Sequence, residues 1–146
     1  PRSMNVVVDA SVLIKFYVPE ILSDRAERLL ARVEKQEIAL LAPDLIYPET
    51  GNILWKKQRL KELTHSEVEE ITDAILLLPL KIEVSKPLLT VAVDIAIACR
   101  VTVYDALYLS LAKVYETTMI TADRRLVEAL AKTNLKDSIT WLGSYK

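Results

Sequence analysis

Met4-Asn5-Val6-Val7-Val8-Asp9, near the start of this 146-residue sequence, carries three consecutive valines and ends in an acid. A short uninterrupted β-branched run is typical of a strand buried on both faces, as in a parallel sheet. In open parallel sheets, ligands bind beyond the carboxyl ends of the strands. We therefore predict a central parallel strand that delivers Asp9 to the functional edge of a sheet.

Strand-like and helix-like segments alternate along the rest of the chain. Further strands are predicted at 38–42, 81–84, 117–121 and 139–142. Apolar spacing and caps predict helices at 22–33, 44–60, 64–78, 88–99, 102–114 and 123–132. This alternation predicts an α/β domain with a mainly parallel sheet of about five short strands flanked by helices. The stretch 44–78 contains no strand, so we expect a helical hairpin added to the sheet.

The helix predicted at 88–99 is apolar almost all round, apart from Asp94. A helix that is apolar on every face is usually buried. We therefore expect this helix to be packed on several sides.

Several kinds of chemistry are excluded by what the sequence lacks. Cys99 is the only cysteine, so there is no internal disulfide and no cysteine-rich zinc site. His65 is the only histidine, and Thr64-His65-Ser66-Glu67 is a helix capping box, which argues against a Ser-His-Asp triad or a histidine-rich zinc site. Two glycines are too few for a Walker A loop or a dinucleotide fingerprint. Carboxylates, hydroxyls, lysines or arginines must supply any chemistry.

Length and charge define the expected organisation. We predict a single domain over 4–146, and we interpret residues 1–3, before Met4, as an expression remnant. No apolar run reaches membrane-spanning length without a break and no signal peptide is recognisable, so we expect a cytoplasmic protein with no membrane partner. The net charge of −1 offers no overall attraction to nucleic acid, which would need bound cations or a basic rim.

Four acids fall where a parallel sheet would collect them. Asp9 and Asp123 each close a predicted strand, whereas Glu49 and Asp105 lie in apolar helix openings with no cation within one helical turn. A carboxylate in such surroundings costs free energy unless it is paired or bound to a cation. Carboxylate oxygens are the ligands that Mg²⁺ and Mn²⁺ prefer, and such a site can activate water for attack on a phosphodiester.

Each acid also has a simpler interpretation. Asp9 and Asp123 can each serve as a helix N-cap, and Glu49 and Asp105 can each complement a helix dipole or cap a helix. The coincidence of four such acids at the expected edge favours the metal site. Asp94 also lies on an apolar helix, but it falls in none of the family motifs described next.

Four segments resemble, in the same order, the motifs of PIN-domain proteins, and especially of the VapC toxins of toxin–antitoxin pairs. They are residues 6–15, 48–54, 104–112 and 121–126. The resemblance covers nearly the whole chain, although 56–86 matches only in general character. It implies that four residues are the catalytic, metal-binding acids: Asp9, Glu49, Asp105 and Asp123. It also implies three supporting polar residues: Ser11, Thr121 and Asn52.

This resemblance implies a PIN-like three-layer fold and a Mg²⁺- or Mn²⁺-dependent endoribonuclease that is the toxin of its pair. The implied partners are RNA, a second copy of the chain, and a VapB-type antitoxin that blocks the acidic groove.

Other residues are candidate contacts to RNA. Lys15, Arg124 and Arg125 lie close in sequence to predicted pocket acids. The basic cluster within 56–61 either contacts phosphates or forms a solvated helix end with cations near its C-terminus. Three tyrosines can stack on bases, although core packing is expected for at least two of them: Tyr104, Tyr108 and Tyr115.

Two rival functions remain open. A catalytically idle PIN-like module would bind a partner without cleaving RNA, but four intact acids argue against it. Phosphoryl transfer through an aspartyl-phosphate on Asp9 would need a second aspartate two residues on, where Ser11 stands.

Overall fold

The computed structural model describes residues 4–146. Residues 1–3, which we interpret as an expression remnant, lie outside the described residues. Within 4–146, five parallel strands form one sheet in the order β3-β2-β1-β4-β5. The strands are β1 (Met4–Val8), β2 (Ile38–Pro43), β3 (Leu80–Glu83), β4 (Met119–Thr121) and β5 (Ile139–Trp141). The predicted α/β fold with a mainly parallel sheet is confirmed.

The valine run of β1 occupies the centre of the sheet. Val7 and Val8 are fully buried, and Val7 is paired with Leu41 of β2 on one side and Met119 of β4 on the other. Strand order reverses across β1, since β2 and β3 lie on one side and β4 and β5 on the other. Such a switch point, at the carboxyl ends of the strands, is where open α/β sheets bind ligands.

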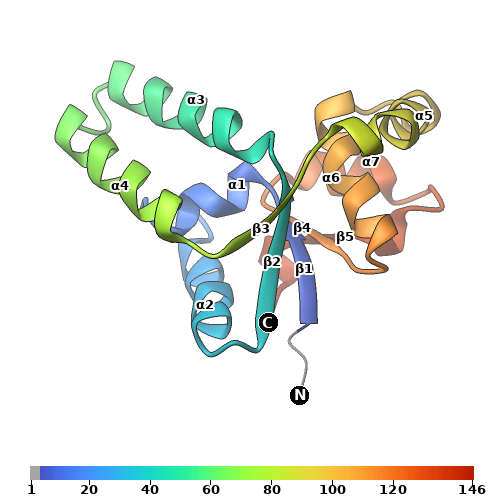
Figure 1. Cartoon of the computed structure of the whole chain (residues 1–146), viewed down its shortest axis with the longest axis horizontal. Helices are drawn as coiled ribbons and strands as arrows, with labels where there is room; N and C mark the ends of the chain where they lie inside the picture. Colours follow the sequence, from blue (N-terminus) through green and yellow to red (C-terminus); the bar gives the residue numbers. More distant parts are fainter. Residues whose placement is uncertain (1–3) are drawn as a thin grey trace.

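Helices flank the sheet and extend beyond it (Figure 1). They are α1 (Ala10–Leu13), α2 (Ser23–Glu34), α3 (Ile46–Arg59), α4 (His65–Leu77), α5 (Leu89–Cys99), α6 (Val103–Val114) and α7 (Arg124–Leu130). Short 3-10 turns span Ile14–Phe16, Lys86–Leu88, Lys136–Ser138 and Leu142–Ser144. The α3–α4 hairpin and the α5–α6 pair diverge from the sheet as two arms, so the predicted helical hairpin is present (Figure 1).

Local capping chemistry explains where the helices begin. Thr64 and Glu67 form the predicted capping box at the start of α4. Thr102 caps α6 by accepting a hydrogen bond from the backbone N–H of Asp105. The predicted helix from residue 44 begins only at Ile46, and no side chain caps it.

The prediction for α5 is wrong in one respect. Only Ala92 and Ile95 of this helix are buried, whereas Ile97 is 74 % exposed. The helix packs on α6 along one side and leaves the rest of its apolar surface uncovered by this chain. An apolar sequence indicates that a helix needs partners, but it does not say whether they belong to the same chain.

Within residues 4–146, no individual helix has the length and apolar character needed to cross a membrane. Lys86–Cys99 and Val103–Val114 meet those criteria only as a pair bent by 114°.

Candidate metal centre

The four predicted acids surround one cavity of about 300 Å³. Its lining contains Asp9, Ala10, Ser11, Glu49, Asn52, Ile53, Asp105, Tyr108 and Asp123. No lysine, arginine or histidine is among these lining residues. The fold thus gathers four carboxyl groups that are far apart in the chain and provides no cationic side chain in the wall to neutralise them.

Each of the four acids lies at the start of a helix. Asp9 follows β1 and caps α1 by accepting a hydrogen bond from the Val12 N–H, and Asp123 follows β4 and caps α7. Glu49 lies in the first turn of α3, and Asp105 lies in the first turn of α6. The capping and metal-site interpretations of Asp9 and Asp123 are therefore compatible. The positive ends of these helices offset part of the repulsion between the carboxylates.

Asp9 is the most buried of the four acids, with 8 % of its surface exposed. Its Oδ1 accepts a hydrogen bond from Ser11 Oγ at 2.5 Å, and its Oδ2 accepts one from Thr121 Oγ1 at 2.6 Å. Burial raises the pKa of Asp9 from 3.8 to about 6, and the nearby charge of Asp105 adds to this, although the hydrogen bonds oppose it. Ionising Asp9 is therefore costly without a cation.

Two hydroxyls join the loop after β1 to the loop after β4. Ser11 Oγ accepts a hydrogen bond from the Ala122 N–H at 3.0 Å, in addition to donating to Asp9. Thr121 is fully buried, and its Oγ1 accepts from the Asp123 N–H at 3.1 Å while donating to Asp9. These bonds fix the position of Asp9 relative to Asp123.

Glu49 is oriented by Tyr108, a residue whose place in the site the sequence reasoning missed. The Tyr108 hydroxyl donates to Glu49 Oε1 at 2.6 Å, and the ring is 1 % exposed. Burial raises the pKa of Glu49, the hydrogen bond from Tyr108 lowers it, and the charge of Asp105 raises it. Burial and the bond to Glu49 also raise the pKa of Tyr108, which keeps its proton. The available indication was spacing, since Tyr108 follows Asp105 by three residues on the same helix.

Asp105 shares this environment. Burial raises its pKa, the hydrogen bond with Thr102 opposes the shift, and the charge of Asp123 raises it further. Three of the four acids therefore have raised pKa values caused by burial and mutual repulsion. This combination is typical of functional sites.

The donor set fits a hard divalent cation. Four acids and Asn52 line the cavity, and oxygen donors suit Mg²⁺ and Mn²⁺. Among residues 4–146, no three His, Cys, Asp or Glu side chains are arranged closely enough to hold a single ion together. Mg²⁺ usually takes one or two carboxylates directly and keeps several waters, so the cavity fits this mode of binding.

The predicted basic contacts lie outside the cavity lining. Lys15 Nζ is paired with Glu20 at 2.9 Å, a partner that the sequence analysis did not identify. Arg124 lies over the ring of Trp141, with the guanidinium carbon 4.6 Å from its centroid. Arg125 is exposed.

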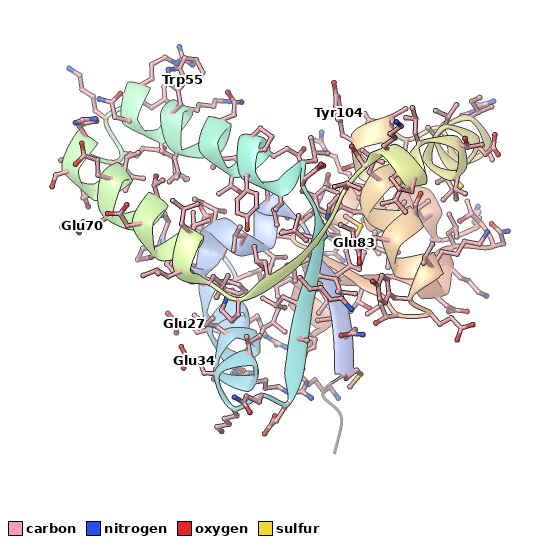
Figure 2. All side chains as sticks on the ribbon, in the orientation of Figure 1. Glu27, Glu34, Trp55, Glu70, Glu83 and Tyr104 are labelled. Carbon is pink, nitrogen blue, oxygen red and sulfur yellow. The ribbon has the colours of Figure 1, made fainter. Side chains whose placement is uncertain are left out.

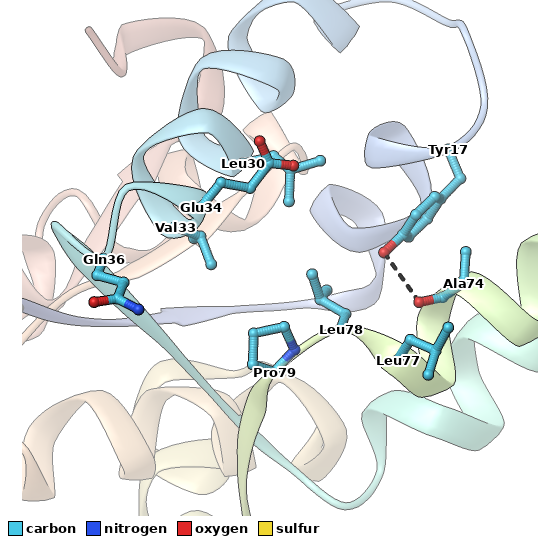
Figure 3. A pocket seen from close by; sticks show the side chains of 9 residues that line it. All are labelled: Tyr17, Leu30, Val33, Glu34, Gln36, Ala74, Leu77, Leu78 and Pro79. Carbon is cyan, nitrogen blue, oxygen red and sulfur yellow. Dashed lines mark hydrogen bonds between the residues drawn. The ribbon is translucent and has the colours of Figure 1, made fainter.

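A larger cleft, of about 460 Å³, lies between α2 and the end of α4 (Figure 3). Its wall is mainly apolar, with Leu77 and Pro79 on one side and Glu34 as its single acid. The Tyr17 hydroxyl donates to the carbonyl of Ala74 across it, at 3.5 Å. The cleft shares no residue with the acidic cavity, so size does not identify the site; the carboxylates do.

Fold and cavity together define an α/β protein with a cluster of carboxylates at the switch point of a parallel sheet. The sequence profile of the PIN domain matches residues 6–132. This chain belongs to the PIN domain family.

Three known proteins are similar to this chain. The chain is 36 % identical to Ribonuclease VapC3 of Pyrobaculum aerophilum over 127 residues, which is 86 % of this chain and 94 % of the relative. The crystal structure of PAE2754 from the same organism has 27 % identity and a TM-score of 0.67, and the match covers 97 % of this chain and 85 % of that one. VapBC2 of Rickettsia felis, bound to a promoter DNA fragment, matches with a TM-score of 0.68 over 94 % of this chain and 98 % of that one. At 12 % identity, this last likeness shows the fold alone.

Proposed function

We propose that this chain is a VapC-type endoribonuclease that cleaves RNA with Mg²⁺ or Mn²⁺ bound in the cavity lined by Asp9, Glu49, Asp105 and Asp123, where one or two carboxylates would bind the ion directly and the others through water. One observation carries the proposal: four carboxyl groups line a single cavity without a cationic side chain among them. The 36 % identity to a protein named as a ribonuclease, over 94 % of its length, supports the RNA-cleaving activity.

A bound divalent cation would supply an activated water and neutralise charge on the phosphate. The residues of the chain prepare the site for it. Ser11 and Thr121 hold both oxygens of Asp9, so this carboxylate cannot rotate away from the cavity. Tyr108 holds Oε1 of Glu49 and leaves Oε2 without that partner.

Asn52 completes the set of supporting polar residues. It follows Glu49 by three positions on α3, lines the same cavity and is exposed at its mouth. Its amide can donate to a phosphate oxygen or to a water, which the carboxylates cannot do.

Cleavage of a fluorophore–quencher RNA tests this proposal. The wild-type chain should cleave it when Mg²⁺ or Mn²⁺ is present and not in EDTA, and Asp9→Asn should remove the activity. Asp94→Asn is a matched control because Asp94 is an exposed acid outside the cavity, and it should retain full activity. No cleavage with any divalent cation would favour the idle binding module instead.

The proposed partners are a VapB-type antitoxin and a second copy of the chain. A solved neighbour is a complex named VapBC2, which supports the antitoxin. The uncovered apolar side of α5, where Ile97 is 74 % exposed and Leu89 52 %, supports the homodimer. Ile97→Glu should yield a monomer in light scattering.

We further propose that residues 4–146 act as a single domain in the cytoplasm, where the protein would meet RNA and an antitoxin.

A further inference from the structure

Two exposed aromatic side chains lie on the two arms that flank the acidic cavity. Trp55, on α3, is 56 % exposed, and Tyr104, at the start of α6, is 60 % exposed. Figure 2 shows them at the upper rims of opposite arms, Trp55 on the α3–α4 hairpin and Tyr104 beside α5. Neither ring belongs to the buried or partly buried side chains that form the hydrophobic core. Each belongs to an element that supplies a cavity acid, Glu49 on α3 and Asp105 on α6.

Cations accompany the aromatic ring on α3. Positions 49, 52, 56 and 59 are spaced by three and four residues, so they follow one ridge of the helix away from the cavity. Lys56 and Arg59 are exposed on this ridge, and the guanidinium carbon of Arg59 lies 5.1 Å from the centroid of the Trp55 ring. No acid within residues 4–146 forms an ion pair with Lys56 or Arg59, whereas the neighbouring Lys57 is paired with Glu20 and Glu62.

These features suit one kind of ligand. An exposed flat ring next to free cations is the arrangement that single-stranded nucleic acid uses, with bases on aromatic faces and phosphates on cations. Paired bases in a helix are already stacked, so their faces are not available to a protein ring. A single exposed aromatic residue would need no explanation. Two of them on the two arms that supply Glu49 and Asp105, one beside unpaired cations, favour a strand that crosses the cavity.

We propose that Trp55 and Tyr104 stack on unpaired bases on either side of the phosphate that is cleaved, and that Lys56 and Arg59 bind phosphates of the Trp55 side. This inference rests on the proposed function, because it takes RNA as the substrate. It assigns the preference for single strands to residues outside the catalytic cavity. Trp55 and Tyr104 are specificity-determining residues that touch the substrate away from the reacting atoms.

Binding can be measured without cleavage. A short fluorescein-labelled single-stranded RNA is titrated with the full chain in EDTA, and fluorescence anisotropy gives the Kd. Trp55→Ala and Tyr104→Ala should each raise the Kd at least about fivefold, the lower end of the loss expected for one stacked base. Trp55→Phe keeps a stacking face and should retain most of the affinity. Leu76→Ala is a matched control, since Leu76 is an apolar residue on α4 that is also largely exposed, at 67 %.

Three further results decide between this ligand and others. The same RNA annealed to its complement should bind more weakly and should not respond to Trp55→Ala. Hydrolysis of bis(p-nitrophenyl) phosphate, which has no bases, should be unchanged in Trp55→Ala and Tyr104→Ala. Unchanged single-strand affinity in both variants overturns the inference. So does a change in oligomeric state by light scattering, which would make this face a contact between copies of the chain. Failure of the proposed function can be distinguished from failure of this inference. It would appear as the absence of metal-dependent cleavage, and it would not change the binding measurement in EDTA.

Discussion

Two clusters of charge each include a residue of α3, and they behave in opposite ways. In one, Glu20 accepts hydrogen bonds from Lys15 at 2.9 Å and from Lys57 at 3.0 Å. Burial opposes ionisation of Glu20, but the two lysines outweigh it and lower its pKa. In the other, the acidic cavity, burial raises the pKa of Asp9 to about 6 and no basic residue lies in the wall.

The difference shows how a structural charge can be told from a functional one. Both clusters remove charged groups from water, which costs free energy in each case. The cost of burying Glu20 is offset within the chain by Lys15 and Lys57, and the bond to Lys57 joins the segment after α1 to α3. The cavity acids have no such cationic partner in the cavity wall, so an external cation can stabilise them. A fold that keeps such an uncompensated cluster usually does so for function.

The largest expected effect comes from removing the hydroxyl that orients Glu49. Tyr108→Phe removes the hydroxyl that donates to Glu49 Oε1 and keeps the buried ring. Loss of a group that orients a metal ligand typically costs about 10- to 100-fold in activity or metal affinity. We expect RNA cleavage to fall by that factor. Tyr115→Phe is the control, because Tyr115 bonds to Glu83 outside the cavity and its removal should leave the rate unchanged.

Asp9→Asn should stabilise the protein in EDTA at pH 7, even though it abolishes activity. The substitution removes a buried charge whose pKa is raised from 3.8 to about 6. At 1.36 kcal/mol for each pKa unit, the gain is on the order of 2 to 3 kcal/mol before the hydroxyls of Ser11 and Thr121 readjust. Urea denaturation measures it. A less stable variant would mean that Asp9 is a structural residue of the same kind as Glu20.

The pH dependence of stability sharpens this contrast. Between about pH 4 and pH 6 the folded protein keeps the Asp9 proton, whereas the unfolded chain has lost it. The folded state then binds more protons, so the contribution of Asp9 to the free energy of unfolding falls as pH rises through this interval. Glu49 and Asp105 act in the same direction, since their pKa values are also raised.

Glu20 acts in the opposite direction. Its lowered pKa gives stabilisation that is present above its ordinary value of 4.5 and is lost as pH falls through the folded value.

The raised pKa of Asp9 can be tested by urea denaturation in EDTA from pH 4 to pH 7. The difference in the free energy of unfolding between Asp9→Asn and wild type should grow as pH rises, because only wild type carries the Asp9 carboxyl group. A constant difference across the range would contradict the shift assigned to Asp9.

The smallest effect concerns the paired cluster. Glu20→Gln should destabilise the protein by about 1 kcal/mol, between the values typical of exposed and of buried ion pairs. It leaves the half-buried Lys15 without a counter-charge and leaves Lys57 with only the more exposed Glu62. Glu37→Gln, at the more exposed pair with Arg32, is the control and should change stability by less. A stabilising Glu20→Gln would remove the contrast on which the comparison depends.

Local sequence was enough to place most elements and all four acids. Asp9 and Asp123 could be located because each closes an apolar strand and precedes a helix, so strand, turn and cap all agree. Thr64 and Thr102 could be identified as caps from the acid three residues later. These features depend on neighbours within one turn, which a single sequence displays directly.

Features that depend on distant pairs could not be predicted. Glu20 and Lys57 are 37 positions apart in the sequence, and Glu49 and Tyr108 are 59 apart, so neither hydrogen bond can be predicted from local spacing. The exposure of α5 was missed for a related reason. Its apolar composition is the same whether the covering surface belongs to this chain or to a partner.

Calorimetric titration with Mn²⁺ at pH 7, on wild type, Asp9→Asn and Asp94→Asn, is the most direct test of whether the cavity of the four acids binds a divalent cation. We expect wild type and Asp94→Asn to bind Mn²⁺ and to gain thermal stability from it, as mass action requires. Asp9→Asn should start more stable in EDTA and gain little or nothing from the metal. Equal Mn²⁺ binding by Asp9→Asn and wild type would contradict a shared site at this cavity, and so would the absence of binding by wild type.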